Sequence, residues 1–77
     1  MNKADILIDV HPDLSSDERD TLETEIITVN GVLHAHFDPK HPRGHGLYVE
    51  YDPQVISARA LLEEVRRWDE KATMSGL

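Results

Sequence analysis

The spacing of the apolar residues changes from a strand period to a helix period and back, and this order restricts the chain to a small group of folds. The residues from Ala4 to Val10 alternate with the period of a half-buried strand. One face has Ala4, Ile6, Ile8 and Val10, and the other has Asp5, Leu7 and Asp9. Ser15, followed three residues later by Glu18, is a capping-box signature for the start of a helix. The apolar residues then take helical spacing, so the sequence predicts a helix from Ser16 to Val29.

A hairpin of two strands is predicted to follow this helix. The pair Asn30-Gly31 favours the left-handed backbone that ends a helix. Alternation then predicts strands from Val32 to Phe37 and from Leu47 to Tyr51, joined by a Pro- and Gly-containing loop from Asp38 to Gly46. In the first of these strands, the residues predicted to face the core are Val32, Leu33, Ala35 and Phe37. The two histidines of the strand are predicted to face the opposite way.

A second helix and a short tail complete the pattern. Ser57 is a candidate N-cap, and the helix is predicted to end near Trp68, whose side chain is expected at the edge of the core. The apolar stripe of this helix comprises Ala58, Leu61, Leu62, Val65 and Trp68. The tail from Lys71 to Leu77 alternates weakly, and its periodicity fits both a frayed end and a short strand.

Composition predicts one small cytoplasmic domain, residues 1–77. A chain of 77 residues buries only about 60% of the surface that it exposes when unfolded, which suffices for one modest core. The absence of cysteine excludes disulfides and thiolate metal sites and favours the cytoplasm. No segment is apolar enough for a signal peptide or a membrane span, so a mature protein without a membrane partner is expected. The formal charge of −7 disfavours nucleic acid and attracts cations or a basic protein surface.

Two runs of the sequence resemble recurrent phrases of the heavy-metal-associated (HMA) domains, a family of small metal chaperones. The runs are Val29-Asn30-Gly31-Val32 and Val49-Glu50-Tyr51-Asp52-Pro53, the latter leading through Val55 and Ser57 into the second helix. The resemblance covers nearly the whole chain. It implies that the tail forms a fourth strand, near Ala72 to Leu77.

The order of elements is that of the α+β ferredoxin-like βαββαβ class. It predicts an antiparallel four-stranded sheet in the spatial order 4-1-3-2, numbered along the chain, with both helices on one face. The predicted core comprises Ile6, Ile8, Leu22, Ile26, Phe37, Val49, Leu61 and Val65. HMA domains bind copper(I) through a Met-x-Cys-x-x-Cys motif after the first strand, and those cysteine positions fall near Leu14 and Asp17 here. Neither residue can supply the soft thiolate that selects copper(I).

Histidine is the alternative ligand type in this sequence. All five histidines lie outside the predicted helices, and four of them fall within residues 34–45. Antiparallel strands bring the end of the first strand and the hairpin loop to one edge of the sheet. His11, His36, His41 and His45 are therefore predicted to converge there, with Asp9, Asp13 and Asp38 as further oxygen donors. Neutral imidazole is a common ligand for zinc, nickel and copper(II), and this is the edge at which HMA domains carry metal.

A second candidate metal site lies on the open face of the predicted sheet. If Phe37 pairs with Leu47, then His34 stands opposite Glu50, and His36 stands opposite Tyr48. Two histidines and one carboxylate form a plausible divalent site. Tyr48 on this face is also a candidate for an exposed contact.

The sequence predicts a binding protein rather than an enzyme, because it lacks a nucleophile with histidine and acid at a recognisable spacing and lacks a phosphate-binding glycine loop. The first hypothesis is a chaperone-like or sensor-like protein that binds a divalent transition metal through His and carboxylate in place of Cys. The alternative is an HMA-like module for protein docking that has lost the metal. The uncovered edge of the strand Val32 to Phe37 also allows a homodimer.

Overall fold

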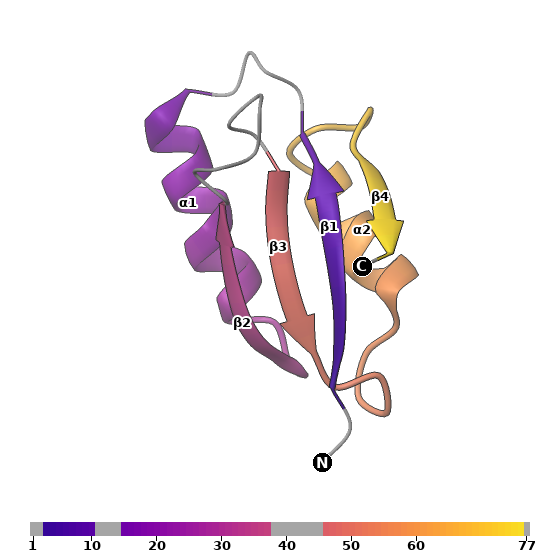
Figure 1. The fold of residues 1–77 in the computed structure, drawn as a ribbon. Coiled ribbons are helices and arrows are strands. Elements are labelled where there is room, and N and C mark those ends of the chain that lie inside the picture. The colour runs from indigo at the N-terminus through magenta and orange to yellow at the C-terminus, as the bar shows by residue number, and fades with distance from the viewer. Residues whose placement is uncertain (1–2, 11–14, 38–45, 77) are drawn as a thin grey trace.

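The computed structural model describes residues 3–10, 15–37 and 46–76 and has an α+β architecture (Figure 1). The elements, in chain order, are β1 (Ala4–Asp9), α1 (Ser16–Ile27), β2 (Val32–Phe37), β3 (Gly46–Tyr51), α2 (Ala58–Arg66) and β4 (Thr73–Gly76). β4 pairs with β1, so the tail forms the strand that the family resemblance implied.

The four strands form one antiparallel sheet in the order β2-β3-β1-β4. This is the predicted order 4-1-3-2 read from the opposite edge of the sheet. Both helices lie on the same side of the sheet (Figure 1). The arrangement is compatible with the ferredoxin-like class, and none of the six described elements covers the other face of the sheet.

The core fills the space between the helices and the covered face of the sheet. Its buried residues are Ile6, Ile8, Val10, Leu22, Ile26, Ala35, Leu47, Val49, Tyr51, Leu61, Leu62, Val65 and Ala72. All the predicted core residues are among them except Phe37, which is partly buried and packs against the cluster. Trp68 also packs against the cluster while partly exposed, which confirms its predicted place at the core edge.

Local signals define the helix ends. The Ser15 side chain accepts a hydrogen bond from the Glu18 N–H, and the Glu18 side chain accepts one from the Ser15 N–H, which completes the predicted capping box. Gly31 has a φ of 97°, which side-chain-bearing residues rarely adopt. Each helix ends two residues before its predicted end, α1 at Ile27 and α2 at Arg66. Such boundaries are the least determined by sequence because the final turn can unwind at little cost.

The predicted inward orientation of Leu33 is wrong. Its side chain is 41% exposed, whereas Ala35 is buried. The register of β2 against β3 shifts between Val32, which pairs with Tyr51, and His34, which pairs with Glu50. Leu33 is the extra residue of this bulge, and an extra residue breaks the period-two alternation on which the prediction depended.

Among the helices of the described ranges, none is both long enough and apolar enough to cross a membrane.

Candidate functional site on the open face of the sheet

Six residues of β1, β2 and β3 form the centre of the sheet surface opposite the two helices, which we call the open face. They are Asp5, Leu7, His34, His36, Tyr48 and Glu50. Their neighbours along the strands, such as Ile6, Ala35 and Val49, are buried on the helix side, so alternation directs these six away from the core.

The two histidines have the cross-strand partners that the sequence predicted. His34 pairs with Glu50, and His36 pairs with Tyr48, because Phe37 pairs with Leu47. On the other side of β3, Asp5 pairs with Glu50. The open face therefore contains a row of His34, Glu50 and Asp5 beside a second row that begins with His36 and Tyr48.

The rings of His34, His36 and Tyr48 lie in contact. The ring centroids of the two histidines are 5.0 Å apart, and those of His36 and Tyr48 are 5.1 Å apart. His34 is exposed, whereas His36 is partly buried. The Nδ1 atom of His36 is fully buried and has no hydrogen-bond partner within residues 3–10, 15–37 and 46–76. A buried ring nitrogen in this state is energetically unfavourable, so the His36 ring is incompletely hydrogen-bonded by the described part of the chain.

Tyr48 is held by Asp5. Its hydroxyl donates a hydrogen bond to Asp5 Oδ1 across 2.9 Å. This hydrogen bond raises the pKa of Tyr48 above its ordinary value of 10.0, and burial and the charges of Asp5 and Glu50 act in the same direction. The phenol therefore stays protonated at neutral pH, so Tyr48 can orient the His36 ring but cannot act as an anionic ligand.

Glu50 is engaged by a cation of the same chain. The Lys3 ammonium lies 3.9 Å from Glu50 Oε1, and the side chains are 59% and 28% exposed, respectively. This surface ion pair contributes little to stability because water screens it. The pair still matters for binding, because any second cation that uses the Glu50 carboxylate must compete with Lys3 for it.

Only part of the predicted cluster of histidines at one edge of the sheet lies within the described residues. His11, His41 and His45, together with Asp13 and Asp38, lie outside the described residues. The strand ends that lead to them do lie at one edge, since Asp9 pairs with Gly46 and Phe37 pairs with Leu47. His36, the fourth predicted member, points to the open face one residue from that edge.

Within residues 3–10, 15–37 and 46–76, no group of three or more His, Asp or Glu side chains is gathered closely enough to hold a metal ion. The described part of the chain instead provides two adjacent imidazoles, with the Glu50 carboxylate opposite His34 on the neighbouring strand.

Sequence reasoning did not assign roles to Lys3 and Asp5. Alternation placed Asp5 on the open face, which was a usable signal for a polar contact there. Its partner Tyr48 lies 43 residues away, however, and Lys3 precedes the regular part of β1. Contacts of this range depend on strand order and register, which residue spacing alone does not fix.

No protein-family model matches the sequence, and comparison with curated proteins gives no significant match. Membership of the HMA family stays a prediction from the sequence.

Proposed function

We propose that this protein binds a divalent transition metal such as zinc, nickel or copper(II) through His34 and His36, with Glu50 as the carboxylate ligand. The observation that carries the proposal is the contact between the two imidazoles on one strand face, their ring centroids 5.0 Å apart. Two neutral imidazoles and a carboxylate suit borderline divalent ions. The role is chaperone-like or sensor-like, in a cytoplasmic HMA-like domain of ferredoxin-like fold that is not an enzyme.

The bonding state of His36 supports this ligand set. Its buried Nδ1 lacks a hydrogen-bond partner among the described residues, and a metal ion would engage the lone pair of this nitrogen. Tyr48 packs against the same ring and is itself fixed by Asp5, so the ring is oriented by a neighbour that does not compete as an anion.

Glu50 completes the set after a change of side-chain rotamer. Cross-strand partners in an antiparallel pair have Cβ atoms about 5 Å apart, which is within reach of a shared ion. In the structure the Glu50 carboxylate lies against Lys3 instead. A divalent cation carries twice the charge of the ammonium, so it competes favourably for the carboxylate at close range.

The predicted edge cluster of His11, His36, His41 and His45 is a second arrangement for the same activity, and it shares His36 with the open-face set. The two arrangements differ in their remaining ligands. An open-face site depends on His34 and Glu50, whereas an edge site depends on His11 and on the loop histidines.

The test is calorimetric titration of protein purified without a histidine tag with zinc, nickel and copper(II). We expect stoichiometric, submicromolar binding of at least one ion, with a loss of tenfold or more in His34→Ala and in His36→Ala. His11→Ala and the His41→Ala/His45→Ala double variant are the matched controls and should bind as the parent does. Loss of affinity in these controls, with none in His34→Ala, would assign the metal to the edge cluster. Absence of submicromolar binding in the parent would refute the metal proposal.

The alternative function is protein docking through the sheet without metal. One observation favours it, namely that Leu33 is 41% exposed on the edge strand β2. An exposed apolar residue on an edge strand is a common feature of surfaces that add a strand from a partner. This function becomes the better account if the parent protein binds none of the three ions.

A further inference from the structure

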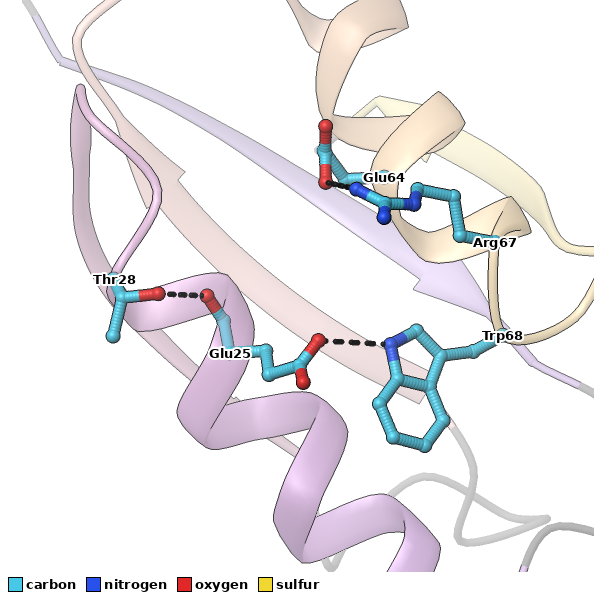
Figure 2. A network of polar contacts seen from close by, with 5 residues as sticks. All are labelled: Glu25, Thr28, Glu64, Arg67 and Trp68. Atoms are coloured by element: carbon cyan, nitrogen blue, oxygen red, sulfur yellow. Dashed lines mark hydrogen bonds and ion pairs between the residues drawn. The ribbon is translucent and has the colours of Figure 1, made fainter.

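A separate feature lies on the helical side of the sheet, where the end of α2 approaches α1. Trp68 follows α2 by two residues, and its indole N–H donates a hydrogen bond to Glu25 Oε2 of α1 across 3.1 Å (Figure 2). Beside it, Arg67 Nη1 lies 3.3 Å from Glu64 Oε2. These four side chains line a hollow of about 270 Å³, which we call the Trp68 hollow.

The lining of the Trp68 hollow suits a cation. It comprises an indole ring, two carboxylates and one guanidinium. The face of an indole attracts ammonium and guanidinium groups, and carboxylates beside it add direct charge attraction. Arg67, the one cation among the described residues that line the hollow, already lies against Glu64, so the negative charge of Glu25 is left to act on its interior. The net charge of −7 on the whole chain draws cations toward the surface from a distance.

The size of the hollow limits what it can hold. Pockets for drug-sized molecules have volumes of about 300 to 1,000 Å³, and the Trp68 hollow is smaller than this range. One long side chain fits such a volume. A larger adjoining hollow of about 450 Å³, lined by residues 66–71, has three basic and two acidic side chains and so does not select the sign of a ligand.

We propose that the Trp68 hollow binds an arginine or lysine side chain from a basic segment of a partner protein. The aromatic ring provides the stacking surface, and Glu25 and Glu64 provide the charge. Trp and Arg are also the residue types most enriched among the energetically dominant positions of protein interfaces. The hollow lies on the side of the sheet opposite His34 and His36, so this inference does not depend on the proposed metal site.

Trp68 is the sole tryptophan of the sequence, so its fluorescence reports on this hollow alone. The experiment titrates the full chain with an amidated tri-arginine peptide at low salt and follows the tryptophan emission. We expect a saturable change in emission. Glu25→Gln and Glu64→Gln should each weaken binding about threefold or more, which is the range that a partly exposed cation site supports. Glutamine at position 25 can still accept the indole hydrogen bond, so the variant is expected to fold.

Glu63→Gln is the matched control. It removes the same charge from α2, but Glu63 pairs with Arg66 and does not line the Trp68 hollow. We expect the affinity of this variant to stay at the parent value. Equal weakening in all three variants would show that only net charge matters, and equal binding of a tri-glutamate peptide would exclude selection for cations. Either result, or the lack of a saturable change in the parent, would overturn the proposal.

Discussion

The side chain of Glu23 in α1 accepts a hydrogen bond from the backbone N–H of Phe37 in β2, with Oε2 and N 3.1 Å apart. β2 lies at the edge of the sheet, where unpaired backbone groups can join the strand of another molecule. Near the end of the strand, one of these backbone donors, the Phe37 N–H, is already hydrogen-bonded to the Glu23 side chain. The contact therefore restricts the homodimer that the sequence allowed through this edge.

Replacing Glu23 tests both effects of this contact. Glu23→Ala leaves the partly buried Phe37 N–H without its acceptor, and we expect a loss of about 1 to 3 kcal/mol in the free energy of unfolding. It also opens the edge, so light scattering should detect more dimer than in the parent. Glu23→Gln keeps an acceptor oxygen and should lose less than Glu23→Ala. Equal stability and equal mass in the parent and Glu23→Ala would show that the contact is unimportant in solution.

The core between α1 and the sheet provides a second prediction. Ile26 is 2% exposed, and Ile26→Ala leaves a cavity that should cost about 2 to 5 kcal/mol in the free energy of unfolding, measured by urea denaturation. Ile27, the next residue of the same helix, is 46% exposed. Ile27→Ala makes the same chemical change at the surface and should stay within about 0.5 kcal/mol of the parent. Similar losses at both positions would contradict the observed orientation of α1.

The sequence predicted the features of this fold that depend on neighbouring residues. Alternation identified β1 and β3, and the Ser15–Glu18 capping box identified the start of α1. The pairing of β2 with β3 was also predictable from the sequence. The pair of Phe37 with Leu47 fixes each pair from the hairpin to the bulge. Periodicity left β4 ambiguous, since a strand of four residues shows too few alternations to be distinguished from a tail.

What the sequence did not predict depends on contacts between distant residues. Leu33 was assigned to the wrong side because one inserted residue reverses the alternation without changing local composition. The hydrogen bond from Trp68 to Glu25 joins residues 43 positions apart, as does that from Tyr48 to Asp5. Each requires the register or the helix packing to be known first. Of the candidate metal ligands, the pairing of His34 and His36 with β3 was predictable, whereas the Lys3 contact with Glu50 was not.

The Tyr48 contact with Asp5 predicts a specific pH dependence. Asp5 raises the pKa of Tyr48, so Asp5→Asn should lower that pKa toward the ordinary value of 10.0. The folded state favours the protonated phenol. The contribution of the Tyr48 contact with Asp5 to stability is therefore fully present below pH 10. It is lost as the pH rises through the higher pKa that Tyr48 has in the folded protein. Ultraviolet titration of the parent and Asp5→Asn measures the shift, and Tyr48→Phe identifies which of the two tyrosines is responsible. An unchanged titration curve in Asp5→Asn would remove Asp5 as the cause.

Metal affinity should depend on pH through the imidazole ligands. Histidine binds a metal only in its neutral form, and its ordinary pKa is about 6.5. We therefore expect affinity to fall as the pH is lowered and protons compete for the ring nitrogens, by up to about tenfold per pH unit for each histidine that must lose a proton. Calorimetry from pH 5.5 to about 8 measures the slope. His34→Ala should retain only the dependence of the remaining histidine, and a slope equal to that of the parent would exclude His34 as a ligand.

Lys3 should reduce metal affinity at the open face. Its ammonium lies 3.9 Å from the Glu50 carboxylate, where it occupies the proposed ligand and repels an incoming cation. Lys3→Gln removes this charge while keeping most of the side-chain length, and we expect affinity to rise about two- to fivefold at low salt. The gain should shrink at higher ionic strength, because salt screens exposed charges.

Lys71→Gln is the matched control, since Lys71 follows α2 and lines a hollow on the helical side. If both variants gain equally, the change reflects net charge alone. If Lys3→Gln gains nothing while the parent binds metal, Glu50 is not a ligand, and the two histidines must find their third partner elsewhere in the chain.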